Sequence, residues 1–332
     1  MRIIKHVGKT NPFITVFLKN LNCSVIFLLL ITGIITGCKK SNGFILTEKE
    51  NILDTSVKAI SISDIKPIIS INNQLNVLGY GYDVTGMYAD MISVRNPVID
   101  LKRFEKENSN YISNMIIRSQ DYIPMPDKGM DALAFLQELS YNVDKTSKFA
   151  LFKASLGHPF KDFNPFNQKS FYRKSTTLIR HRLIRMYSSP EKITDYLTDS
   201  FKTALQTMSP DQLVRRYGTH VMTAIYTGAK FEIVEQRTDK DLPSSRRIFY
   251  YTRGCDSSKA MYSMLSLGRD AKTPDINISD WQSTFTEGKT VLIDFGEQGL
   301  IPLSDLIADV SKKSAVEEYI KIYLQDNQAK LD

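Results

Sequence analysis

The side chains best suited to chemistry in this chain are its histidines and cysteines, and their spacing fits none of the common active sites. The 332 residues include four histidines and three cysteines. His158, His181 and His220 are too far apart for the His-Glu-x-x-His pattern of a zinc site. The sequence also lacks a Gly-x-Ser-x-Gly elbow, a phosphate-binding P-loop and a Cys-x-x-Cys pair. We therefore expect a protein that is not an enzyme, with no catalytic residue, no metal and no cofactor.

His220 is the candidate for a lone general base, since imidazole titrates near neutral pH. It stands two residues after Gly218, where a short helix is predicted to end. A histidine just past a helix end is more often a hydrogen-bonded structural residue than a base. We therefore interpret His220 as structural.

One cysteine does fit a covalent modification. Residues 1–37 carry four basic side chains and no acidic one, and they end in an apolar run from Ser24 to Gly37. This order is typical of an export signal, and the run is shorter than the ~20 residues of a membrane span. The alternative is a buried core helix. The run ends in Ile35–Cys38, which resembles the lipobox of bacterial lipoproteins, so we predict a signal peptide over 1–37 and lipidation at Cys38.

The charge of the exported chain argues against nucleic acid as a partner. Removing residues 1–37 lowers the formal charge from +7 to +3, which leaves no strong basic footprint. Residues 38–70 are predicted to form the lipidated N-terminus and a tether, and residues 71–332 one domain without internal repeats. We expect an exported lipoprotein of the outer membrane, on its cell-surface or periplasmic face. Only Cys255 would keep a free thiol, so no internal disulfide can form.

The elements that must position these residues alternate along the chain. Apolar stripes at helical spacing and helix-start signals predict helices, whereas β-branched and aromatic runs predict strands. The cations within 169–186 are expected on a solvated face, with lipid phosphates as the alternative partner. Strands are predicted over 75–86, 169–186, 219–237 and 290–295, and helices over 131–139, 190–208, 210–217 and 312–325, with Gly218 as a left-handed stop.

The residues around His220 resemble the signature of the membrane attack complex/perforin (MACPF) family. In that signature an aromatic residue followed by Gly-Thr-His joins a short helix to a long central strand. Here Tyr217, Gly218, Thr219 and His220 stand in that order. Three more stretches are similar to bacterial members, notably lipoproteins of Bacteroidetes: Leu78–Gly86, Leu292–Gly296 and Leu300–Ile307.

The resemblance implies an α+β fold with a bent and twisted four-stranded antiparallel sheet. Two helical clusters would flank the sheet, one within about 105–168 and one within about 238–287. The family signature residues would be structural, and glycines would permit the strand bends. These bend glycines are Gly79, Gly81, Gly86 and Gly228.

The resemblance also implies a function. In pore-forming members the two clusters unfurl into amphipathic hairpins, and a closed β-barrel satisfies every backbone group in lipid. The implied partners are a lipid membrane, further copies of the chain and a receptor on a target cell, with killing of competing bacteria as the use. Val221 and Ala229 depart from the family pattern. The alternative is a non-lytic binding or adhesion lipoprotein with the same fold, and a membrane-anchored hydrolase comes third.

Overall fold

The computed structural model describes the chain from Asn76 onward, with gaps. The described residues are 76–141, 143, 150–157, 170–237, 246–255 and 278–328, and all of them belong to the compact unit Ile60–Asp332. The predicted signal peptide, Cys38 and the tether lie outside the described residues. The predicted α+β class with antiparallel sheets is confirmed.

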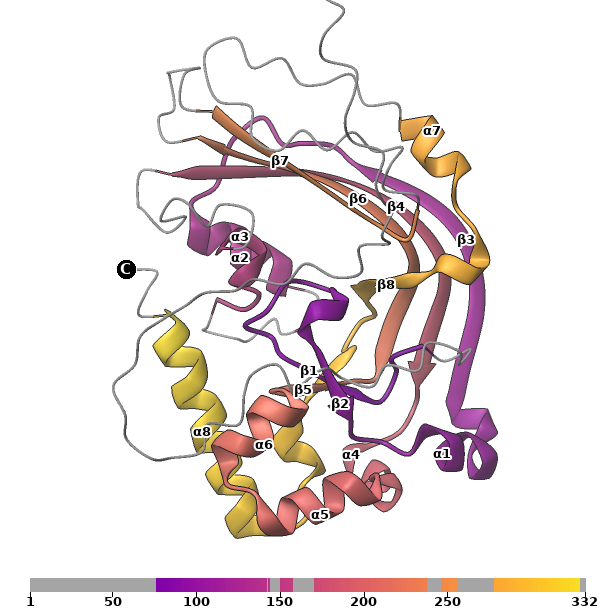
Figure 1. Ribbon diagram of the computed structural model, residues 1–332, viewed down its shortest axis with the longest axis vertical. Coiled ribbons are helices and arrows are strands. Elements are labelled where there is room, and N and C mark those ends of the chain that lie inside the picture. The colour runs from indigo at the N-terminus through magenta and orange to yellow at the C-terminus, as the bar shows by residue number, and fades with distance from the viewer. Residues whose placement is uncertain are drawn as a thin grey trace, which may run out of the picture. The chain divides into compact units, whose positions relative to one another are not determined.

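The main sheet has five antiparallel strands in four rows, because two of them, β7 and β8, pair with different parts of β6. Its order is β3-β4-β6-β7, and β8 also pairs with β6. The long strands curve together, with α2 (Ala132–Ser140) and α3 (Ala154–Gly157) on the concave side and α7 (Ile278–Ser283) on the outer side (Figure 1). The strands are β3 (Ile112–Ile123), β4 (Phe171–Met186), β6 (Ala224–Arg237), β7 (Arg246–Arg253) and β8 (Val291–Phe295).

Two of these strands lie where helical clusters were expected. β3 falls within 105–168 and β7 within 238–287, so the main sheet has five strands rather than four. In the part of the chain that the structure describes, β3 has a strand neighbour on one side only. None of the β3 side chains is buried, on either face of the sheet, and β3 accordingly has no clean apolar alternation.

A second, small sheet crosses the base of the first. Its order is β2-β1-β5-β9, all antiparallel. The strand predicted over 75–86 shortens to β1 and pairs here, not in the main sheet. The long strand predicted over 219–237 divides at Thr223, whose N–H donates to the Gly299 carbonyl at 2.8 Å. The strands are β1 (Tyr80–Tyr82), β2 (Val94–Pro97), β5 (His220–Met222) and β9 (Leu300–Pro302).

The helix predicted over 190–208 is interrupted. Its first turns end near Tyr196, whose carbonyl accepts the N–H of Asp100 at 2.7 Å. Thr198 then caps a new helix, because its Oγ1 accepts the N–H of Phe201 at 3.2 Å. Contacts from a distant segment therefore override a continuous apolar stripe.

The helices predicted over 131–139, 210–217 and 312–325 start and end within a few residues of these bounds, whereas three further helices were not predicted individually. Ser209 and Gln212 form a capping box at the start of α6. The α-helices are α1 (Leu101–Glu107), α2 (Ala132–Ser140), α3 (Ala154–Gly157), α4 (Pro190–Ile193), α5 (Asp199–Thr207), α6 (Pro210–Tyr217), α7 (Ile278–Ser283) and α8 (Val310–Gln328). Short 3₁₀ helices occupy η2 (Met91–Ser93), η3 (Ser109–Tyr111), η4 (Thr194–Tyr196), η7 (Glu287–Lys289) and η8 (Leu303–Leu306).

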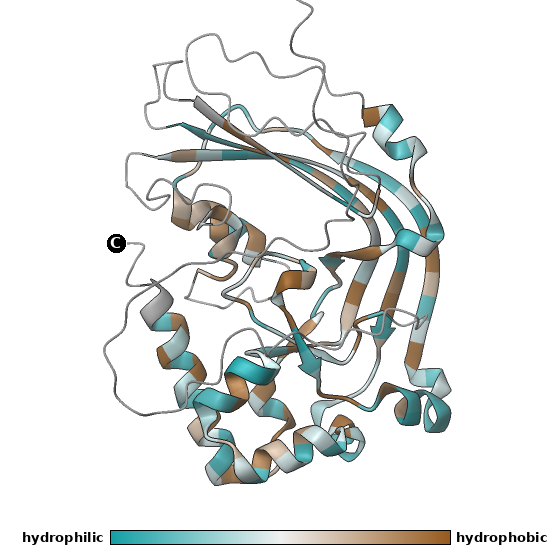
Figure 2. Ribbon diagram, in the orientation of Figure 1, coloured by the Kyte–Doolittle hydropathy of each residue, from teal (hydrophilic) through white to brown (hydrophobic). Residues whose placement is uncertain are grey.

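Apolar side chains gather on both faces of the main sheet. The larger core lies on the concave side and continues through the small sheet to α5, α6 and α8. A smaller cluster on the outer face surrounds Trp281 of α7. Figure 2 shows polar and apolar bands along the long strands. None of the helices in the described ranges is both long and apolar enough to cross a bilayer.

Candidate functional site at the junction of the two sheets

The tetrapeptide singled out in the sequence forms the joint between α6 and β5. The N–H of Gly218 donates to the Val214 carbonyl at 2.8 Å and closes the helix. Gly218 has φ 81° and ψ −174°, so its φ is positive as expected but its ψ is extended rather than left-handed helical. This region is essentially restricted to glycine. An added Cβ would lie 2.5 Å from the carbonyl oxygen of Tyr82.

Thr219 ties the joint to the strands on either side. It is fully buried. Its N–H donates to the Tyr82 carbonyl at 3.0 Å, and its Oγ1 accepts the N–H of Val84 at 3.1 Å. Its carbonyl accepts the N–H of Leu303 at 2.9 Å. One threonine thus links β1 to the start of η8.

The aromatic and imidazole side chains of the joint are also internal. The Tyr217 hydroxyl donates to the Ser200 carbonyl at 3.1 Å, and its ring packs edge-on against Phe201. His220 is 9% exposed, and its Nδ1 lies 3.0 Å from the Thr219 Oγ1. No group of three or more possible metal ligands occurs among the described residues. The arrangement around His220 is that of a packed joint.

Two of the four predicted bend glycines, Gly81 and Gly228, permit close backbone contacts, and a third has a positive φ. At Gly81 an added Cβ would lie 1.7 Å from the Tyr217 carbonyl oxygen. Gly79 has φ +77° where the chain enters β1. Gly228 lies opposite the β4 bulge at His181, and its added Cβ would lie 1.8 Å from the Ile179 oxygen. Gly86 differs, because it closes a turn after β1 rather than bending a strand.

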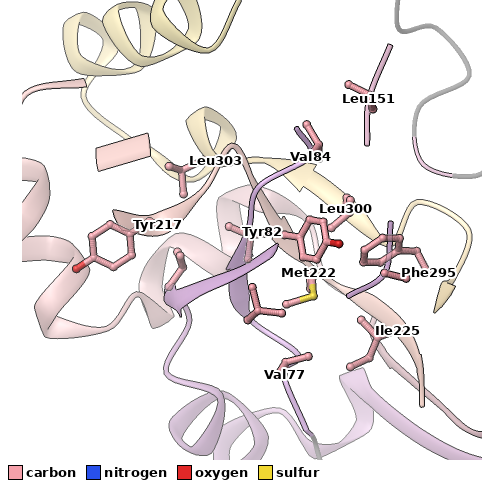
Figure 3. Close-up of a cluster of buried hydrophobic side chains, with 14 of the residues drawn as sticks. Val77, Tyr82, Val84, Leu151, Tyr217, Met222, Ile225, Phe295, Leu300 and Leu303 are labelled. Carbon is pink, nitrogen blue, oxygen red and sulfur yellow. The ribbon is translucent and has the colours of Figure 1, made fainter. Parts of the chain in front are cut away.

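An aromatic cluster joins this junction to the segment predicted as the first helical cluster. Phe152 is fully buried and its ring centroid lies 4.9 Å from that of Tyr88 and 6.2 Å from that of Phe295. Figure 3 shows Tyr82 and Phe295 facing one another, with centroids 5.0 Å apart. The N–H of Phe152 donates to the Val84 carbonyl at 2.5 Å. Residues 150–157 are therefore docked against β1 and β8.

Above this cluster, the concave face of the main sheet carries buried charges. Lys230 is 3% exposed, and its Nζ lies 2.8 Å from Oε1 of Glu232. Burial lowers the pKa of Lys230 to about 8, which the adjacent Glu232 carboxylate partly offsets. Arg180 pairs with Asp294 at 3.0 Å and also with Asp121. A cavity of about 530 Å³ beneath α2 is lined by Arg180, Lys230, Glu232 and Asp294.

The pairing of these charges differs from the solvated face expected for the cations within 169–186. Lys174 lies 4.0 Å from Glu232, and Arg180 spans two carboxylates. A period-two alternation within β4 could have placed Lys174 and Arg180 on one face. Their partners come from β3, β6 and β8 and could not be assigned without the strand order.

Comparison with known proteins identifies the fold. No family model matches the chain, and no curated protein matches it in sequence. The MAC/Perforin-domain protein of Bacteroides thetaiotaomicron matches it with a TM-score of 0.61 at 17% identity, over 79% of this chain and 63% of that protein. GNIP1Aa of Chromobacterium piscinae matches with a TM-score of 0.60 at 16% identity, over 77% and 56% respectively. This chain thus spans less than two thirds of either structure, and the likeness is one of fold.

Proposed function

We propose, from the premise that this chain has the MACPF fold, that it acts on membranes by assembling into a pore and not by catalysis. In this proposal the chain is an exported lipoprotein of the outer membrane, anchored through Cys38. Copies oligomerise on the membrane of a target bacterium, where a surface receptor can concentrate them. Segments beside the main sheet then become hairpins of a shared barrel.

The docking of residues 150–157 is the observation that carries the proposal. This segment belongs to the long connection between β3 and β4, which would supply the first hairpin. Two backbone hydrogen bonds join it to the chain after β1: Phe152 to Val84, and Ala154 to Thr85 at 3.2 Å. Its anchor is the aromatic contact of Phe152 rather than a continuous ladder. Such a segment can leave its site while β3, β4 and β6 keep their pairing.

A reversible tie across this contact tests the proposal. The hydrogen bond between Ala154 and Thr85 brings the two backbones close enough for the Cα separation of 4.4–6.8 Å in a disulfide. We would introduce Thr85→Cys and Ala154→Cys in a chain that carries Cys255→Ser. Dye release from liposomes of bacterial outer-membrane lipid would then be measured with the tie oxidised and reduced. We expect release to stop on oxidation and to return on reduction.

Two controls complete the experiment. Each single cysteine variant should release dye equally under both conditions, because neither can form the tie. Equal release by the oxidised and reduced double variant would show that residues 150–157 need not move. An unmodified chain that releases no dye on any lipid would exclude pore formation under these conditions.

One observation favours the alternative of a non-lytic binding or adhesion lipoprotein. Part of the segment expected to unfurl second is already a strand, since β7 pairs with β6 along Lys230–Arg237. Residues 238–245 alone connect these two strands, and a membrane hairpin needs legs of ~9–11 residues each. A chain that binds intact target cells and releases no dye would have this second function.

A further inference from the structure

The edge of the main sheet beside β6 is formed by two strands that meet end to end. β7 ends with Arg253 opposite Lys230, and β8 begins with Val291 opposite Gly228. Gly254 has φ +76°, and an added Cβ there would lie 2.4 Å from the Gly228 oxygen. The chain therefore leaves the sheet at Gly254 and returns to the same edge at Val291. Residues 254–290 are an excursion within one interrupted edge strand.

This arrangement constrains how a second hairpin could grow. The connection over 238–245 is too short to supply both legs. Additional chain has to come from 254–290, on the far side of β7. Lengthening the hairpin thus requires β7 to move along β6 and change its register. The contacts that fix the register of β7 on β6 therefore control whether the second hairpin can lengthen.

On the concave face, β7 is held by a buried carboxylate of the small-sheet region. Asp90 is 5% exposed and accepts a hydrogen bond from the Tyr251 hydroxyl. The Arg253 guanidinium lies 3.3 Å from Asp90 Oδ2 and also donates to the Ala89 carbonyl. Breaking such a pair would leave buried charges without compensation.

On the outer face, β7 is held by the excursion itself. Trp281 is fully buried, and its Nε1 donates to Oγ1 of Thr252 at 2.5 Å. Its ring packs against Phe231 of β6, with centroids 5.7 Å apart. Since neighbouring residues of a strand face opposite sides, Tyr251 and Thr252 fasten the same part of β7 from both faces.

We propose that Asp90 and Trp281 form a two-faced latch that fixes the register of β7. The second hairpin lengthens only after both contacts open and β7 slides toward its connection with β6. This inference rests on the proposed function for its consequence in a membrane. The latch itself is a property of the soluble chain and can be measured there.

Hydrogen exchange of the full chain in solution tests the latch directly. Tyr251→Phe removes the hydroxyl that donates to Asp90, and Trp281→Phe removes the indole donor to Thr252. We expect amides of 246–253 to exchange about tenfold faster in each variant, and faster still in the double variant. Amides of β4 should keep their wild-type rates. Tyr122→Phe, at a tyrosine that is 64% exposed on β3, is the matched control and should change neither set.

Dye release by the same variants tests what the latch controls. We expect the double variant to release dye several-fold faster than wild type. Unchanged exchange of 246–253 in the double variant would overturn the latch. Faster exchange without faster release, while wild type does release dye, would overturn its control of hairpin growth. If wild type and every variant release nothing, the proposed function fails, and the exchange rates alone decide the latch.

Discussion

At Gly228 the path of the main sheet depends on the lack of a side chain in glycine. The carbonyl of Ile179 occupies the space that a Cβ would need, next to the bulge at His181. Any other residue has to push β4 and β6 apart at the point where both bend. The same glycine also lies against Gly254, where β7 ends.

We expect Gly228→Ala to lower the free energy of unfolding by about 1–3 kcal/mol, as overpacking does in cores. Urea unfolding followed by circular dichroism measures the change. Gly288→Ala is the matched control, because nothing lies within 4 Å of a Cβ at Gly288. Equal midpoints for the two variants would contradict the crowding argument.

Lys230 gives the fold a pH dependence with a defined sign. Burial lowers its pKa from the ordinary 10.5 to about 8 in the folded chain. The unfolded chain therefore binds this proton more tightly, and the group's contribution to stability rises as the pH increases from about 8 to 10.5.

We expect the stability of wild type relative to Lys230→Met to increase between pH 7.5 and pH 10. Urea unfolding of both chains at several pH values measures the difference. Lys202→Met, at a lysine whose side chain is 42% exposed, serves as the control and should show no such trend. A constant difference between wild type and Lys230→Met across this range would contradict the assignment.

Among the elements, the joint between α6 and β5 is fixed from several sides at once. Gly218 has a backbone conformation that side chains disfavour, and it lies against Tyr82. Thr219 then links β1 to η8. The joint thus sets the position of the small sheet relative to α6.

We expect Gly218→Ala to destabilise the chain by at least about 1 kcal/mol and to lower its Tm by several degrees. His220→Ala should lower the Tm less, since it removes side-chain contacts, including that with Thr219, and leaves the backbone path intact. Differential scanning calorimetry measures both. A Tm for Gly218→Ala equal to that of wild type would show that the joint tolerates a Cβ.

Sequence patterns predicted the elements whose signals are local. The helix-start signal at Ser209 and Pro210 gave the position of α6 directly, and the β-branched run gave that of β4. β3 was missed because its side chains are exposed on both faces and give no apolar alternation. β7 was missed because it owes its pairing to β6. The break in the predicted helix near Tyr196 was missed because it depends on a residue far away in sequence. The N–H of Asp100 donates to the Tyr196 carbonyl.

In the candidate site, too, some features could be predicted from the sequence and others could not. The signature from Tyr217 to His220 could be found in the sequence, since its residue types are specific. The pairing of Lys230 with Glu232 and of Arg180 with Asp294 could not. In the sequence these charged residues cannot be told from ordinary solvated side chains. Only the strand order of the sheet shows that they lie together beneath α2.

At the scale of the whole molecule, the first prediction concerns anchoring. Cys38 ends the lipobox-like stretch, and its thiol would accept the lipid that holds the chain at the outer membrane. We expect Cys38→Ala to move the protein from the detergent phase to the aqueous phase on phase separation, or to leave the signal peptide attached. Processing and retention equal to wild type would exclude a lipid anchor at this residue.

The interrupted edge strand also has a consequence for how the chain folds. β7 follows β6 after only residues 238–245, so this pairing closes a short loop at low entropic cost. β8 pairs with the same strand only after residues 254–290 of the chain, so this contact is more distant in sequence. Closing a longer loop costs more conformational entropy, so we expect β8 to pair with β6 after β7 does. We infer that Lys230–Arg237 of β6 pair with β7 early in folding and that Ile225–Gly228 pair with β8 later. The sheet edge beside β6 therefore forms from the C-terminal end of β6 toward its N-terminal end.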